Sequence, residues 1–254
     1  MPGDDARTDG AARDGGRGGD AARGGPAGEG GPAVGRVTLE MVKADPRVRA
    51  YLQAVDDYLE AVGYTEHGRR HAGLVSSIAR NILTHLGYPE RQAELAAIAG
   101  YLHDLGNLAG RPRHWQTGAV LAAHLLDGMG MAPAEVAAIV AAVGNHDELD
   151  GEPTNAVGAA LILADKSDVH RSRVRNRDPA TFDIHDRVNY AVTRSFLRVD
   201  PARRSVTLEL TIDTDACGVM DYFEIFLDRM LLCRRAARFL GCRFDLQFNG
   251  ISLA

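Results

Sequence analysis

The chain of 254 residues has little of what several large classes of protein require. Its three cysteines are too few for a disulfide scaffold, and none forms a Cys-x-x-Cys pair for a thiolate zinc site. Basic residues do not exceed acidic ones, 29 against 34, so binding to nucleic acid through phosphate contacts is not expected. No apolar run reaches the ~20 residues of a membrane helix, and no apolar export segment follows Met1. These absences predict a cytoplasmic protein without membrane association.

The first 36 residues are also poor in large apolar side chains. They consist mainly of Gly, Ala, Arg, Asp and Pro, and such a composition buries too little surface to fold. We therefore predict a disordered tail over 1–36.

Residues 37–178 have apolar residues at three- and four-residue spacing, which is typical of packed helices. The predicted helices are 47–62, 68–86, 89–105, 113–128, 133–146 and 156–171. Glycines lie at or just beyond most of their ends, where helix caps belong. The short connections predict a helical bundle.

The pattern changes in residues 179–254. A helix is predicted over 182–193, strands over 195–199, 205–212 and 244–248, and a long helix over 219–240. These segments predict a small α+β appendage on a mostly α protein. The Met- and Phe-rich long helix is expected to serve as core or as a homodimer interface.

Four histidines lie on the apolar faces of four different predicted helices. His71, for example, shares its face with Val75 and Ile78. Asp104 and Asp165 join them, and a buried carboxylate is costly unless a cation compensates it. Imidazoles and carboxylates from neighbouring helices are suitable ligands for a transition metal. The six candidate ligands are His71, His103, Asp104, His114, His146 and Asp165.

The order of these residues resembles the HD superfamily of metal-dependent phosphohydrolases. The matching segments are His71-Ala-Gly-Leu-Val75, Leu102-His103-Asp104-Leu105-Gly106-Asn107, His114 with Gly118, Asn145-His146-Asp147-Glu148 and Ala164-Asp165-Lys166. The resemblance covers about residues 68–171 and implies an HD-type helical bundle.

The resemblance also implies a ligand assignment. His71, His103, Asp104 and Asp165 would match the one-metal set of the family. His114 and His146 would mark a two-metal site in which Asp104 bridges the ions. The implied cofactors are two divalent or mixed-valence ions, iron or manganese. The family's cyclic-dinucleotide branch has a Gly-Tyr-Pro motif, usually a Lys where Asn107 stands, and a His-His pair in place of Asn145-His146, so that activity is disfavoured.

Several neighbouring polar residues are expected to support the ligands. We expect His67, one helical turn before His71, to contact the ligands or line the entrance, and the same role is assigned to Asn107, Asp147 and Glu148. Lys166, and with it Arg171 and Arg173, is interpreted as contacting the substrate phosphate, although a basic helix end is also often only solvated. The second dipeptide, His185-Asp186, is interpreted as a helix cap or an ordinary surface pair.

The resemblance implies hydrolysis of a small phosphorylated substrate, either an ester or an anhydride. A metal-activated water would attack phosphorus, with Asp104 and Lys166 as catalytic residues. Asp147, Glu148 or His67 would protonate the leaving oxygen. Two alternatives use the same residues: a di-iron oxygenase, or a regulatory nucleotide-binding module without catalysis. The substrate is not specified by the sequence.

Overall fold

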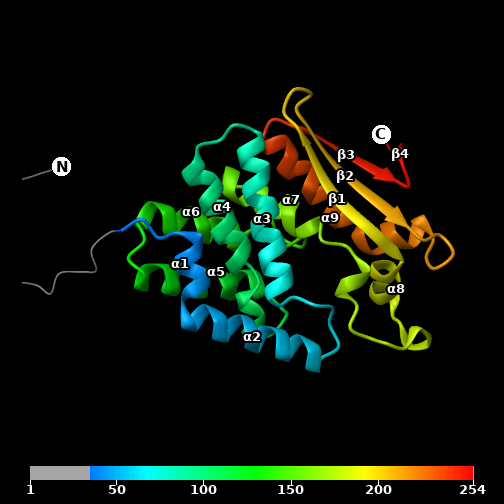
Figure 1. Cartoon of the computed structure of the whole chain (residues 1–254), viewed down its shortest axis with the longest axis horizontal. Coiled ribbons are helices and arrows are strands. Elements are labelled where there is room, and N and C mark those ends of the chain that lie inside the picture. The colour runs from blue at the N-terminus through cyan, green and yellow to red at the C-terminus, as the bar shows by residue number, and fades with distance from the viewer. Residues whose placement is uncertain (1–34, 254) are drawn as a thin grey trace, which may run out of the picture. The chain divides into compact units, whose positions relative to one another are not determined.

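The prediction of a mostly helical fold with a small C-terminal sheet is confirmed by a computed structural model, which describes residues 35–253 (Figure 1). The tail predicted over 1–36 lies outside the described residues except for Gly35 and Arg36. Arg36 donates a hydrogen bond to Glu94 at 3.0 Å. Among the described residues, no helix has both the length and the apolar character needed to cross a membrane.

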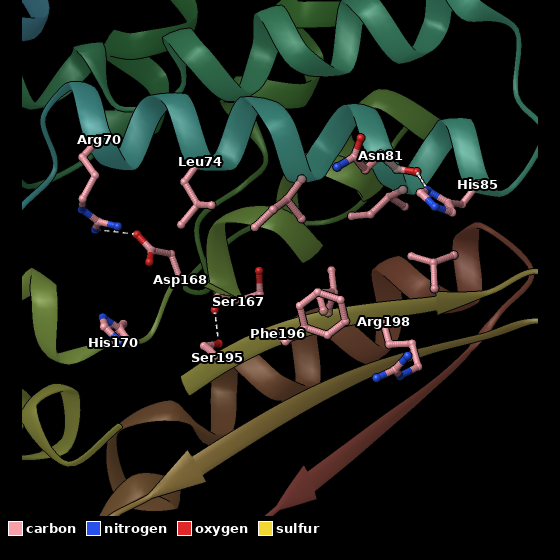
Figure 2. Close-up of a pocket in the computed structure, with 14 residues that line it drawn as sticks. Arg70, Leu74, Asn81, His85, Ser167, Asp168, His170, Ser195, Phe196 and Arg198 are labelled. Atoms are coloured by element: carbon pink, nitrogen blue, oxygen red, sulfur yellow. Dashed lines mark hydrogen bonds and ion pairs between the residues drawn. The ribbon is translucent and has the colours of Figure 1, made fainter. Parts of the chain in front are cut away.

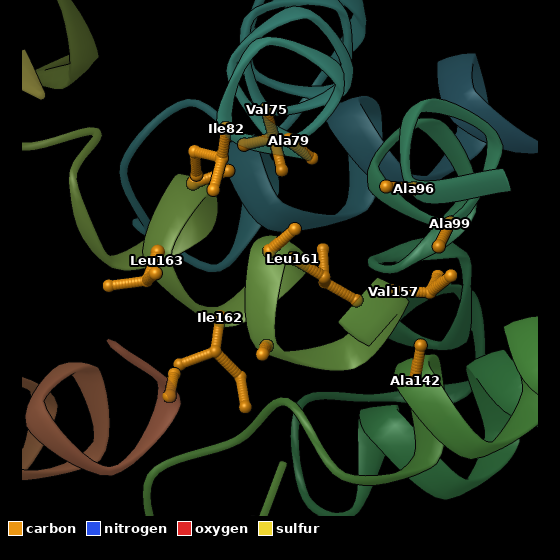
Figure 3. Close-up of a cluster of buried hydrophobic side chains, with 14 of the residues drawn as sticks. Val75, Ala79, Ile82, Ala96, Ala99, Ala142, Val157, Leu161, Ile162 and Leu163 are labelled. Carbon is orange, nitrogen blue, oxygen red and sulfur yellow. The ribbon is translucent and has the colours of Figure 1, made fainter. Parts of the chain in front are cut away.

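The first part of the described chain is built from helices joined by short loops. These are α1 (Leu39–Ala44), α2 (Pro46–Ala61), α3 (Arg69–His85), α4 (Glu90–Leu102), α5 (His114–Gly128), α6 (Pro133–Gly144) and α7 (Ala156–Lys166), with a 3₁₀ turn at Leu105–Ala109. Helix α7 lies at the centre of the core because it packs against α3, α4, α6 and α9. Figure 3 shows Leu161 of α7 among side chains of its neighbours, such as Val75 and Ala99.

The C-terminal part combines two helices with one sheet. Helix α8 (Ile184–Ala191) runs directly into β1 (Val192–Asp200), followed by β2 (Ser205–Ile212), α9 (Val219–Phe239), β3 (Arg243–Phe248) and β4 (Ile251–Leu253). The strand order is β1-β2-β3-β4, with β2 and β3 parallel because α9 crosses between them. Since α9 also packs on α7, the sheet and the helices share one apolar core.

The helices predicted over 89–105 and 133–146 end earlier, at Leu102 and Gly144, and Val192 and Thr193, which were predicted as helix, belong to β1. The structure differs further from the predicted elements in three places. Helix α1 was not predicted, because six residues before Pro46 are too few to show a helical period. Strand β4 was also not predicted. The Asn249-Gly250 turn before it, with both residues at positive φ, is a strong hairpin signal. Helix α7 ends at Lys166 rather than at 171. The Ser167 hydroxyl donates a hydrogen bond to the Ala164 carbonyl oxygen, and the chain then leaves the helix axis.

Candidate active site

The six candidate ligands are placed by the ends of helices that meet at one point of the bundle. His71 and His114 lie in the first turns of α3 and α5. His103 directly follows α4, and His146 and Asp165 lie at the C-terminal ends of α6 and α7. Helix C-termini carry partial negative charge, so three of these ends favour a cation at their meeting point. The four histidines and Asp104 are buried, and Asp165 is only partly exposed.

Each of the four histidines is fixed by a hydrogen bond from Nδ1. Three of them donate to the carbonyl oxygen three residues earlier: His103 to Gly100 at 2.9 Å, His114 to Arg111 at 3.1 Å and His146 to Val143 at 2.7 Å. His71 donates instead to the Asp168 carboxylate at 2.7 Å. A neutral imidazole that donates from Nδ1 has its lone pair on Nε2, which is the state in which imidazole binds a metal.

The Nε2 atoms point at one another and at the two carboxylates. The Nε2 atoms of His71 and His103 lie 3.2 Å apart, and the Oδ1 atom of Asp165 lies 3.3 Å from Nε2 of His71. Potential ligand atoms of His71, His103 and Asp165 all lie within 4.8 Å of one another, and so do those of His103, Asp104 and His146. These two groups have the donor chemistry and the spacing to hold metal ions.

Asp104 lies between the two sides of the cluster. Its Oδ2 atom is 3.4 Å from Nε2 of His103 and 3.6 Å from Nε2 of His71, whereas its Oδ1 atom is 3.4 Å from Nε2 of His114. The imidazole rings of His114 and His146 stack edge to face with centroids 5.2 Å apart. The two carboxylate oxygens therefore face different histidines, as a bridging ligand requires.

The two carboxylates of the cluster stabilise positive charge on the groups around them. Burial would lower the pKa of His103, but Asp104 and Asp165 outweigh burial and raise it to about 10. Burial would likewise raise the pKa values of the two carboxylates, but His103 for Asp104 and Lys166 for Asp165 keep them well below the ordinary range. Burial lowers the pKa of His146 well below its ordinary value, so this imidazole is neutral and can ligate.

Asn107 and Asp168, outside the ligand set, hold the ligands in place. Asn107, a predicted supporting residue, donates from Nδ2 to Asp104 Oδ1 at 2.9 Å. Asp168 was not predicted, although it follows Asp165 by three residues. Its Oδ2 atom accepts from His71 Nδ1 and from Arg70 at 3.0 Å, and the ion pair with Arg70 is visible in Figure 2. Asp168 also lines a groove between α3 and β1 (Figure 2).

We predict that Asp168→Ala weakens metal binding about 10- to 100-fold, because His71 loses the acceptor that sets its ring orientation. Isothermal titration of Mn²⁺ into the metal-free protein measures this loss. Asp168→Asn keeps an oxygen acceptor for Nδ1 and should lose less. Equal affinities in the wild type and folded Asp168→Ala would contradict the assigned role.

Lys166 is buried and forms part of a chain of ion pairs. Its Nζ atom lies 2.8 Å from Asp165 Oδ2 and 2.6 Å from Glu148 Oε2, and Glu148 Oε1 accepts from Arg229 Nε of α9 at 3.0 Å. Although burial would raise the pKa of Glu148, Lys166 and Arg229 keep it well below the ordinary range. Glu148 therefore has no proton to give to a leaving group, and Lys166 is positioned to hold Asp165.

The two predicted arginines lie in different surroundings. Arg173 is buried, and its guanidinium donates to the backbone oxygens of Glu66 and Asp168. Arg171 is exposed and lies over the ring of Tyr190, 5.2 Å from its centroid, and it does not line the cleft in front of the histidines. Arg111 was not predicted. It lines that cleft and donates to Asn107 Oδ1 at 3.1 Å, close to Asp104.

A cleft of about 1050 Å³ opens from the histidine cluster toward the C-terminal part. His67, His114 and Asp147 lie on the cluster side, with His114 Nε2 at 3.9 Å from Asp147 Oδ2. The opposite side includes His185 and Asp186. The structure shows that this pair faces the cleft, and that Asp183, not Asp186, caps α8. Sequence periodicity alone gives no sign of this, because the pair is far from the cluster along the chain.

Gly106, two residues after Asp104, allows a close approach between backbones. A Cβ atom there would lie 1.8 Å from the His114 carbonyl oxygen and 2.4 Å from the Gly118 nitrogen. Gly106→Ala should therefore push α5 away and destabilise the fold by about 1–3 kcal/mol or more. Displacement of His114 should also reduce the amount of metal bound.

Urea unfolding and metal analysis measure both effects of Gly106→Ala. The matched control is Gly73→Ala in α3, where a Cβ atom meets nothing within 4 Å. Alanine should stabilise a helix interior there by up to ~1 kcal/mol. Wild-type stability and metal content in Gly106→Ala would show that α5 accommodates the methyl group.

Comparison with known proteins agrees with this geometry. The sequence model of the HD domain matches residues 68–169, and this range contains all six candidate ligands. Residues 68–169 are an HD domain. This part of the chain thus belongs to the HD superfamily, a family of metal-dependent hydrolases, and HD domains bind divalent metal ions.

The chain is also similar to a crystal structure described as a predicted HD superfamily hydrolase from an uncultured Thermotogales bacterium. The identity is 26%, the similarity covers 52% of this chain and 73% of the other, and the TM-score is 0.40. No curated protein is similar enough to this chain to give a significant match.

Proposed function

We propose that this HD domain is a dinuclear phosphohydrolase that cleaves a small phosphate ester or anhydride. The supporting observation is the position of Asp104, whose two carboxylate oxygens face different histidines. Iron or manganese ions are the proposed occupants, held by the six ligands described above. When bound, such ions polarise a phosphoryl oxygen and lower the pKa of a coordinated water toward neutrality.

The surrounding residues have defined roles in this proposal. Arg111 lies beside Asp104 at the cleft and can donate to a phosphoryl oxygen, as a guanidinium does well. Asn107 and Asp168 keep Asp104 and His71 oriented. Lys166 is assigned to positioning Asp165 rather than to binding phosphate, because its ammonium group already forms ion pairs with Asp165 and Glu148.

The experiment is anaerobic purification with metal analysis, followed by a panel of phosphate monoesters, diesters and anhydrides. We expect close to two metal ions per chain and metal-dependent release of phosphate from at least one class of substrate. Oxygen consumption without release of phosphate would favour a di-iron oxygenase. Metal binding without either reaction would favour a regulatory module.

A further inference from the structure

The His114 side of the cluster has fewer ligand atoms close together than the other side. Among residues 35–253, the two compact groups of potential ligand atoms described above include the other three histidines but not His114. The Nε2 atom of His114 has Oδ1 of Asp104 at 3.4 Å. Metal ions with nitrogen and oxygen ligands take about four to six of them. An ion bound to His114 and Asp104 therefore has room for a further ligand from the protein.

Asp147 places a carboxylate oxygen beside His114. Its Oδ2 atom lies 3.9 Å from Nε2 of His114, and the residue is only 5% exposed, at the cleft that opens from the cluster. With bonds of about 2.1 Å, two ligand atoms of one octahedral ion lie about 3.0 Å apart in adjacent positions and about 4.2 Å apart in opposite ones. The distances from His114 to Asp104 and to Asp147 both fall in this range. An ion bound to His114 is thus within reach of either carboxylate.

The loop after α6 holds Asp147 in this orientation. Asp147 directly follows His146, and its Oδ1 atom accepts from the Leu149 backbone N–H at 3.1 Å. The carbonyl oxygen of Asp147 accepts from the Gly151 backbone N–H at 2.8 Å. A Cβ atom at Gly151 would lie 2.2 Å from that oxygen, so this close turn requires glycine. One carboxylate oxygen is thus bound to the loop, whereas Oδ2 accepts no hydrogen bond within the described part of the chain.

Asp147 also lacks a basic partner other than His114. The next residue, Glu148, forms ion pairs with Lys166 and Arg229. Asp147 forms no ion pair with a lysine or arginine among the residues that the structure describes. A buried carboxylate is costly unless a cation compensates it. A metal ion at His114 would supply that cation.

From these contacts we infer that Asp147 is a seventh ligand of the metal centre and binds the ion at His114. The inference rests on the proposed dinuclear site and adds a ligand that the family pattern does not include. In this assignment the ion among His71, His103 and Asp165 does not contact Asp147. Asp147 then acts as a ligand and not as the donor of a proton to the leaving oxygen. Its loss should therefore release one ion and leave the other in place.

The test is Asp147→Asn in the full chain. The side-chain oxygen of asparagine can still accept from Leu149, so the change replaces only the ligand atom Oδ2. In an anaerobic titration with Mn²⁺, the wild type should bind two ions and the variant only one with unchanged affinity. The Kd of the second ion should rise at least about 100-fold, because even residues outside the ligand set contribute about 10- to 100-fold.

Electron paramagnetic resonance at low temperature gives a second readout that does not depend on activity. The spectrum of the Mn²⁺-loaded protein should change from that of two coupled ions in the wild type to that of one isolated ion in Asp147→Asn. His114→Ala should lose the same ion and give the same spectrum.

The matched control is Asp150→Asn, which makes the same change of charge at an exposed residue of the same loop and cleft. It should bind both ions as the wild type does. Two ions of wild-type affinity in folded Asp147→Asn, equal weakening of both ions, or an equal effect of Asp150→Asn overturns the inference while the dinuclear proposal stands. If the wild type binds only one ion, the dinuclear proposal fails. The inference then holds only if Asp147→Asn and His114→Ala both lose that ion.

Discussion

Asp104→Ala is expected to lose bound metal and turnover together, with a fall in kcat of at least about 1000-fold. Asp104 is the residue whose oxygens face His71 and His103 on one side and His114 on the other. Without it the proposed site loses its bridging ligand, so neither ion would be held in the required position. The helical content should persist, because the apolar faces of the bundle supply most of the burial.

Metal analysis, circular dichroism and phosphate release from the best substrate of the panel measure this outcome. Asp127→Ala, which removes an exposed carboxylate of α5, should keep both metal and activity. If folded Asp104→Ala retains metal and hydrolysis, Asp104 is not a bridging ligand and the dinuclear proposal fails.

Lys166→Met is expected to have the second-largest effect on the site. It distinguishes a lysine that positions Asp165 from one that binds the substrate phosphate. Methionine keeps most of the side-chain volume but removes the ammonium group from between Asp165 and Glu148. Asp165 then loses its cation and Glu148 keeps only Arg229, which should cost roughly 3 kcal/mol of unfolding free energy. Because Asp165 loses its positioning contact, metal affinity should fall about 10- to 100-fold.

The control for this variant is Lys43→Met in α1, which breaks an exposed pair with Glu40. It should change stability by less than about 0.5 kcal/mol. If Lys166→Met instead binds metal normally but shows a large increase in KM, the lysine contacts the substrate phosphate, as the sequence first suggested. Chemical unfolding, Mn²⁺ titration and steady-state kinetics provide the three measurements.

The helices and the candidate ligands could be predicted from the sequence because both depend on the spacing of apolar and polar residues along short segments. An inward histidine such as His71 stands out when its helical face is otherwise aliphatic. The family pattern then identifies the same residues in their order along the chain. The structure brings all six side chains together as that pattern implies, while their roles as ligands stay a prediction.

Other parts of the site depend on contacts between distant segments, and these have no local signal. The pairing of Arg229 with Glu148 joins α9 to the loop after α6, and no spacing rule relates them. The same holds for His185 and Asp186, which face the cleft only because α8 folds back toward it. Asp168 is an intermediate case. Its position three residues after Asp165 places both near the end of α7, but only the structure reveals its hydrogen bond with His71.

The hydrogen bonds from Nδ1 of His103, His114 and His146 to the third preceding carbonyl have a consequence for the loading of the protein with metal. Each bond closes within its own segment, so these three imidazoles need no contact with distant parts of the chain to keep their orientation. Little side-chain entropy remains to be lost when an ion arrives. Removal of the ions by a chelator should therefore be readily reversible, and a metal-free preparation should regain its ions without refolding.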